Sequence, residues 1–307
     1  MEDSASSHLP YHIPALLHEA IDLLNIKPDG TYIDATFGGG GHSREIISKL
    51  GEKGRLFSFD RDMDAYVNRI EDERFTFVHG NFRHIENFMK FHEVEKVDGI
   101  LADFGVSFHH FDTPERGFSF RVDAPLDMRM NQNSPTTAAQ LLAKADEKQL
   151  NEIFRSYADL KKPGSVVKAI LSARDKSPLE TTFQLVEAVK NALDPRQEKK
   201  ELAQVFQALR IAVNHEADDL QTFLKATLKV LKPGGRLVTL TYHSMEDRLV
   251  KNFMKTGNVE GIEEKDFFGK VNSKWKLITR KPVEASESEV EANPRSRSAR
   301  LRAAELI

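Results

Sequence analysis

The first 105 residues alternate between short β-prone runs and segments with the spacing of amphipathic helices. A helix is predicted over 12–24, where apolar side chains recur at helical intervals. Strands separated by helices form parallel βαβ units, so the pattern predicts an α/β fold with a doubly wound, Rossmann-like sheet. The predicted strands are 31–35, 55–60, 75–82 with its closing turn, 97–103 and, late in the chain, 236–242.

The middle of the chain follows another pattern. Residues 104–131 keep neither a helical nor a strand period, and 136–231 read almost wholly as helices separated by Pro and Gly turns. These helices are too many for one crossover connection, so an all-helical domain inserted into the sheet domain is predicted. The predicted division is 1–105 for the first part of the core, 106–205 for the inserted loop and helical domain, 206–290 for the second part of the core, and 291–307 for a basic C-terminal tail.

Four consecutive glycines, at 38–41, separate the first predicted strand from the next helix. A glycine turn in this place lets the backbone approach a bound nucleotide, and the helix start offers unpaired N–H groups. The dinucleotide fingerprint needs another glycine where Ser43 or Arg44 stands, so an adenosyl ligand without phosphates fits better. A flexible glycine linker is the alternative. The candidate cofactor-contacting glycines are Gly39, Gly40 and Gly41.

Two carboxylates follow predicted strands at one edge of the sheet. Asp60 ends the second strand about 20 residues beyond the glycines, which suits hydrogen bonds to a ribose diol, although a helix cap is an alternative. Asp103 ends the fourth strand, and two acids at the carboxyl ends of parallel strands indicate a ligand crevice. Phe82, after the third strand, lies either against an adenine face or in the ordinary core.

A dense polar cluster, His243 to Arg248, follows the last predicted strand. Catalytic or substrate-contacting groups belong at this edge; Glu246 or Asp247 is a candidate for orienting the loop or relaying a proton, and His243 is a further candidate. Ser244 with Asp247 fits a helix cap equally well. No Gly-x-Ser-x-Gly elbow surrounds Ser244, and the histidines lack metal-binding helical spacing, so neither a hydrolase triad nor a metal is expected.

Aromatic and basic residues are interleaved in the irregular stretch 104–131. This mixture suits stacking on an unpaired base and contacts to phosphate, and a packed Ω-loop with internal Arg–Asp pairs is the alternative. Arg210 and Asn214 of a later predicted helix are four residues apart and therefore share one face. The arginines near the C-terminus either contact an anionic partner or are merely solvated. The candidate substrate-contacting residues are Arg116, Phe118, Phe120, Arg129, Arg210, Asn214, Arg295 and Arg297.

Composition narrows the function classes. The net charge of −3 gives no global basic field, so any contact with nucleic acid depends on local patches. The absence of cysteine excludes disulfides, thiolate zinc sites and a cysteine nucleophile. No run of about 18 apolar residues occurs and the polar N-terminus lacks a signal core, so a soluble, cytoplasmic protein without a membrane partner is expected.

Several long motifs together resemble one family. They are Asp-Ala-Thr-Phe-Gly-Gly-Gly-Gly-His-Ser (34–43), Glu-Arg-Gly-Phe-Ser-Phe (115–120), Pro-Leu-Asp-Met-Arg-Met (125–130), Phe-Gln-Ala-Leu-Arg-Ile-Ala-Val-Asn (206–214), His-Ser-Met-Glu-Asp-Arg (243–248) and Asn-Pro-Arg-Ser-Arg-Ser (293–298). From residue 12 to 302 the chain resembles the MraW family, bacterial methyltransferases that modify cytosine N4 in small-subunit ribosomal RNA. The resemblance implies a class I methyltransferase fold, S-adenosyl-L-methionine as cofactor, no metal, and 16S rRNA of the small ribosomal subunit as partner.

The resemblance also assigns roles to residues. Asp103 becomes the first candidate to accept hydrogen bonds from the target amine, with Ser107 in the same Asp-Phe-Gly-Val-Ser motif. The chain departs from the family pattern at Phe108, at His110, which replaces a cofactor-contacting Gln, and at Tyr242, where Phe is usual. The residues onto which the resemblance carries adenosylmethionine binding are Gly40, Gly41, His42, Asp60, Phe82 and Asp103.

Other functions stay open at the level of sequence. A DNA amino-methyltransferase would use the same chemistry on another nucleic acid. A non-catalytic RNA-binding assembly factor would bind adenosylmethionine without turnover, and the departures at Phe108 and His110 are the motive for it. A nicotinamide dehydrogenase is disfavoured by Ser43 and Arg44. The sequence does not fix whether the chain forms a homodimer.

Overall fold

The computed structural model describes residues 14–105, 113–265, 267 and 273–307. It divides into two compact units, the first formed by Met1–Gly105 with Leu220–Ile307 and the second by Val106–Asp219. The sequence placed the return to the sheet domain at residue 206, fourteen positions before this boundary at Leu220. The difference arises because the helix over residues 198–213 packs its apolar side chains into the core of the second unit.

The first unit is built on a sheet whose described strands have the order β3-β2-β1-β4-β5-β8-β6, with β7 paired to β8 off this path. Strands β1 to β5 are parallel, and β8 is antiparallel to β5. The order reverses between β1 and β4, so the carboxyl ends of these two strands form the switch point where α/β sheets bind ligands. The strands are β1 (Thr31–Asp34), β2 (Arg55–Asp60), β3 (Phe75–His79), β4 (Val97–Asp103), β5 (Leu231–Thr241), β6 (Trp275–Leu277), β7 (Val283–Glu284) and β8 (Arg300–Leu306).

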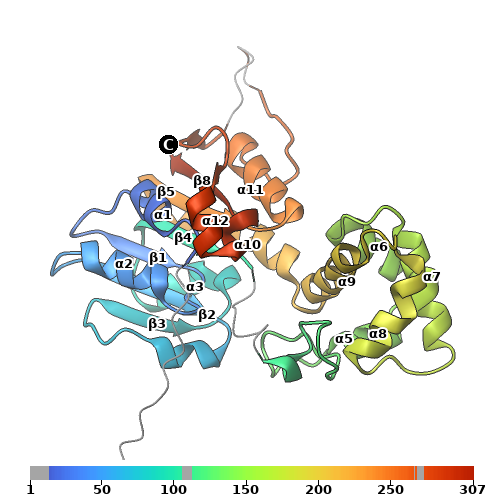
Figure 1. The fold of residues 1–307 in the computed structure, drawn as a ribbon. Coiled ribbons are helices and arrows are strands. Elements are labelled where there is room, and N and C mark those ends of the chain that lie inside the picture. The colour runs from blue at the N-terminus through green and yellow to red at the C-terminus, as the bar shows by residue number, and fades with distance from the viewer. Residues whose placement is uncertain (1–13, 106–112, 266, 268–272) are drawn as a thin grey trace, which may run out of the picture. The chain divides into compact units, whose positions relative to one another are not determined.

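Alternate residues of the central strands enter two cores. Ile33 and Ile100 belong to the core that α3, α10 and α11 cover, whereas Tyr32 and Leu101 belong to the core that α1 and α2 cover. Successive strand side chains point to opposite faces, so helices cover both faces and the predicted doubly wound α/β sheet is confirmed (Figure 1). These helices are α1 (Leu17–Leu24), α2 (Gly41–Lys49), α3 (Ile85–Phe91), α10 (Glu216–Val230) and α11 (Ser244–Thr256).

The C-terminal segment differs from the predicted basic tail. Helix α12 (Glu287–Ala292) and a 3₁₀ turn lead into β8, which is hydrogen-bonded between β5 and β6. Leu301 and Ala303 enter one core, and Ala304 and Leu306 enter the other. The arginines of this segment therefore interrupt the near-continuous apolar run that marks a strand buried on both faces.

The second unit is helical in its described part. Its core gathers apolar side chains such as Leu150, Phe154, Val167, Leu185 and Leu209, which recur at helical spacing and are fully buried. Three of its helices begin with a reciprocal capping box, from Thr137, Asp146 and Thr181, each closed by a Gln three residues later. The helices are α5 (Ala138–Lys144), α6 (Glu147–Tyr157), α7 (Pro163–Arg174), α8 (Thr182–Val189) and α9 (Glu198–Val213) (Figure 1).

Candidate functional site

The glycine turn lies directly after β1, at the switch point of the sheet. Gly38 and Gly40 have positive φ values of 51° and 75°, a conformation that side chains disfavour. A Cβ atom on Gly41 would lie 2.4 Å from the Pro14 ring, so the turn also has no room for a side chain there. Gly40 is the N-cap of α2, and the sequence thus builds a tight backbone turn that opens onto a helix N-terminus.

Asp60, at the end of β2, braces this turn. Its Oδ2 accepts a hydrogen bond from the Gly38 amide at 2.8 Å, and its Oδ1 accepts one from the Asp62 amide at 2.8 Å. Burial raises the pKa of Asp60, and the two amide hydrogen bonds act against that rise. Asp60 is partly exposed, and its predicted contact with a ribose diol stays a prediction.

A buried network beneath the turn was not singled out from the sequence. The Ser43 hydroxyl donates to Asp34 Oδ2 at 2.6 Å and lies 2.8 Å from the Ser58 hydroxyl. The Asp34 carboxyl is fully buried, and this burial raises its pKa to about 6. Its Oδ1 accepts from the Thr36 amide at 3.1 Å, so Asp34 ties β1 to the glycine turn. An acid at the end of a strand that is otherwise apolar was the available signal.

Asp103, at the end of β4, faces groups from three other elements. Its amide donates to the Thr36 hydroxyl at 2.7 Å, and the Tyr242 hydroxyl hydrogen-bonds to its carboxyl group. Its Oδ2 lies 4.0 Å from His42 Nδ1, and its side chain is 23% exposed. Burial, followed by the negative charges of Asp34 and Glu246, raises the pKa of Asp103 to about 7.

His42 is neutral beside this carboxyl group. Its side chain is 5% exposed, and burial lowers the pKa of its imidazole to about 4. The contact with Asp103 is therefore not an ion pair at pH 7. Within the described residues, His42 Nε2 and Asp103 Oδ1 are buried without a hydrogen-bond partner. Buried polar atoms are nearly always paired, so the two atoms fit a site that a polar ligand completes.

The polar cluster after β5 forms the start of α11. His243 is the N-cap of this helix, and Glu246 Oε2 accepts from the Tyr242 and His243 amides at 3.0 and 3.3 Å. Asp247 is buried and pairs with Arg302 at 2.7 Å and Arg300 at 3.2 Å, both on β8. Glu246 therefore caps the start of α11, and roles for Glu246 or His243 in orienting the loop or in catalysis stay predictions.

Phe82 lies on the 3₁₀ turn Phe82–His84, just before α3, and packs against the core of the first unit. Its ring makes edge contacts with Phe223 at 5.2 Å and Phe104 at 5.8 Å between centroids. The side chain is only partly buried, so it packs on the core while retaining exposed surface. The predicted contact with adenine stays a prediction.

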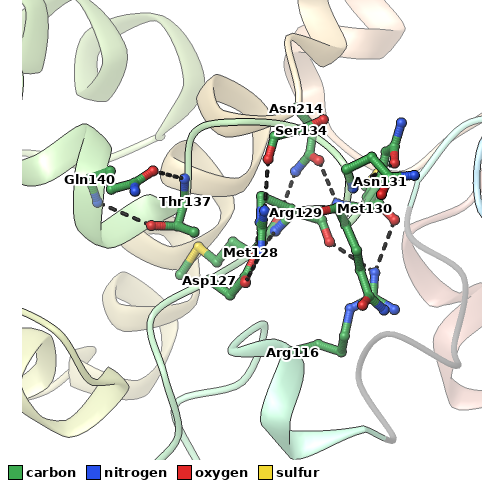
Figure 2. Close-up of polar contacts among 12 residues, drawn as sticks. Arg116, Asp127, Met128, Arg129, Met130, Asn131, Ser134, Thr137, Gln140 and Asn214 are labelled. Atoms are coloured by element: carbon green, nitrogen blue, oxygen red, sulfur yellow. Dashed lines mark hydrogen bonds and ion pairs between the residues drawn. The ribbon is translucent and has the colours of Figure 1, made fainter.

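Two arginines of the irregular loop, Arg116 and Arg129, form hydrogen bonds within the loop itself, as Figure 2 shows. Arg116 is buried and donates to the carbonyls of Arg129 and Met130 at 2.9 Å each. Arg129 forms a two-point pair with Asp127, at 2.8 and 2.7 Å, and donates to two further carbonyls of the loop. Phe118 is buried in the helical core, and Phe120 packs against Phe206.

Arg210 and Asn214, at the end of α9, are also engaged within the second unit. Arg210 forms a buried two-point pair with Glu216, at 2.8 and 2.9 Å. Asn214 donates to the Met128 carbonyl and accepts from the Met130 amide, both at 2.7 Å (Figure 2).

Arg116 and Arg210 are therefore buried and paired within the protein, and their expected direct contacts with RNA stay predictions. A buried guanidinium needs fixed partners, and here protein acceptors provide them. For residues 113–134 the arrangement is that of the alternative, a packed loop with internal Arg–Asp pairing.

The remaining predicted residues lie elsewhere. Arg295 and Arg297 are exposed on the 3₁₀ turn Pro294–Ser298. Ser107, Phe108 and His110 lie outside the described residues. In the part of the chain that the structure describes, no group of His, Asp and Glu side chains is arranged to hold a metal ion. The same residues include no helix long and apolar enough to cross a membrane.

Comparison with known proteins gives the site its context. The MraW methylase family matches residues 10–307. The ribosomal RNA small subunit methyltransferase H of Bacteroides thetaiotaomicron is 54% identical over 297 residues, which are 97% of this chain and 98% of that protein. The protein of the same name from Flavobacterium johnsoniae is 49% identical over 299 residues, 97% of this chain and 99% of its own. The chain therefore belongs to the MraW methylase family.

Proposed function

We propose that this protein is an S-adenosyl-L-methionine-dependent methyltransferase that methylates N4 of a cytidine in 16S rRNA. Relatives at 49–54% identity are named ribosomal RNA small subunit methyltransferase H, and they match this chain over nearly its full length. The observation that carries the proposal is the placement of Asp103, whose buried Oδ1 lacks a partner among the described residues beside the glycine turn. A hydrogen-bond acceptor at the switch point suits the activation of an amino group.

The residues present fit the cofactor. The turn of Gly39, Gly40 and Gly41 leaves the backbone open to an adenosyl group, and we assign its ribose to Asp60, because a carboxylate at the end of the second strand suits a diol. When bound, the cofactor supplies an electrophilic methyl group on a sulfonium. The neutral ring of His42 and the partly exposed ring of Phe82 add a polar and an aromatic group at the same edge of the sheet.

Asp103 then performs the proton chemistry. The cytosine N4 lone pair is delocalised into the ring, so N4 is a weak nucleophile that must be held in line at near-attack distance. Asp103 accepts a hydrogen bond from the amino group and takes up the proton that the nitrogen loses as it is methylated. Its pKa of about 7 suits this exchange, since an ideal catalytic base titrates near the working pH.

The target base leaves any stack to reach such a buried acceptor. We assign RNA binding to the second unit, whose exposed cations are available as local contacts for phosphate in a chain without a global basic field. Arg295 and Arg297 are further exposed cations, on the first unit. The exposed cations of the second unit include Lys161, Lys162, Lys168, Lys176, Arg196, Lys199 and Lys200.

The test is transfer of labelled methyl groups from adenosylmethionine to small ribosomal subunits from cells that lack this protein. Label recovered as N4-methylcytidine after nucleoside analysis is the expected result. Label on DNA oligonucleotides and not on the subunits would indicate a DNA amino-methyltransferase. Tight cofactor binding without label on either would indicate a non-catalytic factor. We assign the protein to the cytoplasm, because its proposed substrate is ribosomal RNA. Whether the active species is a homodimer is decided by its sedimentation.

A further inference from the structure

The pairing of β4 with β5 brings Tyr242 next to Asp103, the proposed catalytic base. Asp103 is in register with Leu240, and the Phe104 amide donates to the Leu240 carbonyl at 2.9 Å. Tyr242 is therefore two residues beyond the partner of Asp103, just past the carboxyl end of β5. A Cβ atom on Gly105 would lie 3.3 Å from the Tyr242 ring, so the backbone after Asp103 runs directly against this ring.

Both the backbone and the side chain of Tyr242 are fixed. Its amide donates to Glu246 Oε2 at 3.0 Å, which belongs to the capping box of α11. Its ring packs against the core under α1 and α2. Its hydroxyl hydrogen-bonds to the carboxyl group of Asp103. A group held in this way keeps its partner in one orientation, because neither its ring nor its backbone is free to turn.

We propose, on the basis of the methyl transfer proposed above, that Tyr242 is a positioning residue that orients the Asp103 carboxylate for the target amine. The Thr36 hydroxyl fixes the backbone of Asp103 from the β1 side, and Tyr242 fixes its side chain from the β5 side. Oδ1, which is buried and has no partner among the described residues, is then left to accept from the amine.

The surroundings of Asp103 disfavour its negative charge, so the hydrogen bond from Tyr242 is important for its ionisation. Burial disfavours the anion of Asp103, and Asp34 on β1 and Glu246 on α11 add negative charge, while His42 on α2 is neutral at pH 7. The hydrogen bond from Tyr242 is the contribution that favours the carboxylate and lowers the pKa of Asp103.

The donor itself does not titrate in the working range. Burial, together with the charges of Asp103, Glu246 and Glu289, raises the pKa of Tyr242 well above its ordinary value. The hydroxyl therefore keeps its proton and remains a donor at every pH at which the enzyme is assayed.

The test is Tyr242→Phe, which removes the hydroxyl and keeps the ring. Without the hydrogen bond the pKa of Asp103 rises, so the acid limb of the kcat/KM profile moves upward by about one pH unit, a tenfold loss on that limb. The rates of variant and wild type converge above about pH 9, where Asp103 is ionised in both. Tyr32→Phe is the matched control, because its buried hydroxyl serves the turn at Lys27 and leaves the limb unmoved.

A second readout does not depend on turnover. Carbon-13 NMR of labelled aspartate carboxyl groups in the free protein, assigned with Asp103→Asn, follows the titration of Asp103 directly. The expected result is a midpoint about one unit higher in Tyr242→Phe than in wild type. An unmoved midpoint, or a loss of rate by the same factor at every pH, overturns the role of Tyr242 alone. A wild-type protein that transfers no methyl group overturns the proposed function and this role with it.

Discussion

Asp103 is the proposed catalytic base, and its buried position disfavours the negative charge of its carboxylate. Replacement by Asn keeps the size and the contact with Tyr242 but removes the acceptor for the amine proton. We expect Asp103→Asn to lower kcat by about 10²–10⁴-fold, the usual contribution of a positioned acid or base. Binding of S-adenosylhomocysteine, measured by calorimetry, should stay within a few-fold of wild type. Activity near the wild-type level would remove Asp103 from the mechanism.

The same substitution has a predictable effect on stability. The pKa of Asp103 is about 7 in the folded protein against an ordinary value of 3.8, so the folded state holds the proton more tightly. The contribution of Asp103 to the free energy of unfolding therefore falls as pH rises from about 4 to 7. Above pH 7 the folded state bears the full cost of the buried carboxylate charge. Asp103→Asn should raise this free energy by roughly 1–3 kcal/mol at pH 8 and leave it unchanged at pH 4. Urea denaturation at both pH values measures it, and an equal effect at both would contradict the burial argument.

At the scale of elements, Asn214 anchors the irregular loop to α9. It pairs with the Met128 carbonyl and the Met130 amide, and Met128 is buried with a φ of 61°, which a non-glycine residue adopts only when its surroundings enforce it. Asn214→Ala leaves both backbone groups without their partner, so we expect a loss of about 2–4 kcal/mol in the free energy of unfolding. The exposed Asn133→Ala is the matched control and should change it by less than about 0.5 kcal/mol. Equal effects of the two variants in urea denaturation would refute the anchoring role.

Strand β8 fixes the start of α11 through Arg302. Asp247 is buried, and Arg302→Met leaves it with Arg300 alone, so we expect a loss of about 2–4 kcal/mol. The exposed Arg297→Met serves as control. Adding Asp247→Leu to Arg302→Met should recover part of the loss, because no buried charge then remains unpaired. A double variant less stable than Arg302→Met would argue against this explanation.

These elements show what a sequence pattern determines and what it leaves open. The strands ending at Asp60 and Asp103 follow from period and composition, because both parameters are local. The partner of Arg116 does not follow from period and composition. In the sequence, an arginine beside phenylalanines is equally suited to binding a phosphate and to donating to a loop carbonyl, and only the fold decides between them. Strand β8 is not evident from the sequence because Arg300 and Arg302 interrupt its apolar residues, and the buried partner of Arg302, Asp247, is known only from the fold. Tyr242 is meaningful only through the register of β5 with β4, which is a tertiary property.

At the scale of the molecule, the two units have separate cores and should respond separately to perturbation. Trp275 is the sole tryptophan of the chain and is buried in a core of the first unit, so its fluorescence reports that unit alone. Circular dichroism reports the helices of both units. A urea titration followed by both signals should therefore give two curves that do not coincide.

Two perturbations should separate these curves further. S-adenosylhomocysteine at about one hundred times its dissociation constant should stabilise the Trp275 transition by about 2.7 kcal/mol, because its proposed site lies in the first unit. Asn214→Ala should move only the part of the dichroism curve that Trp275 does not follow, since its partners Met128 and Met130 belong to the second unit. If ligand and variant each move both signals by the same amount, the chain unfolds as one cooperative unit. The insertion is then part of a single folding domain, in which ligand binding and loop anchoring are thermodynamically linked.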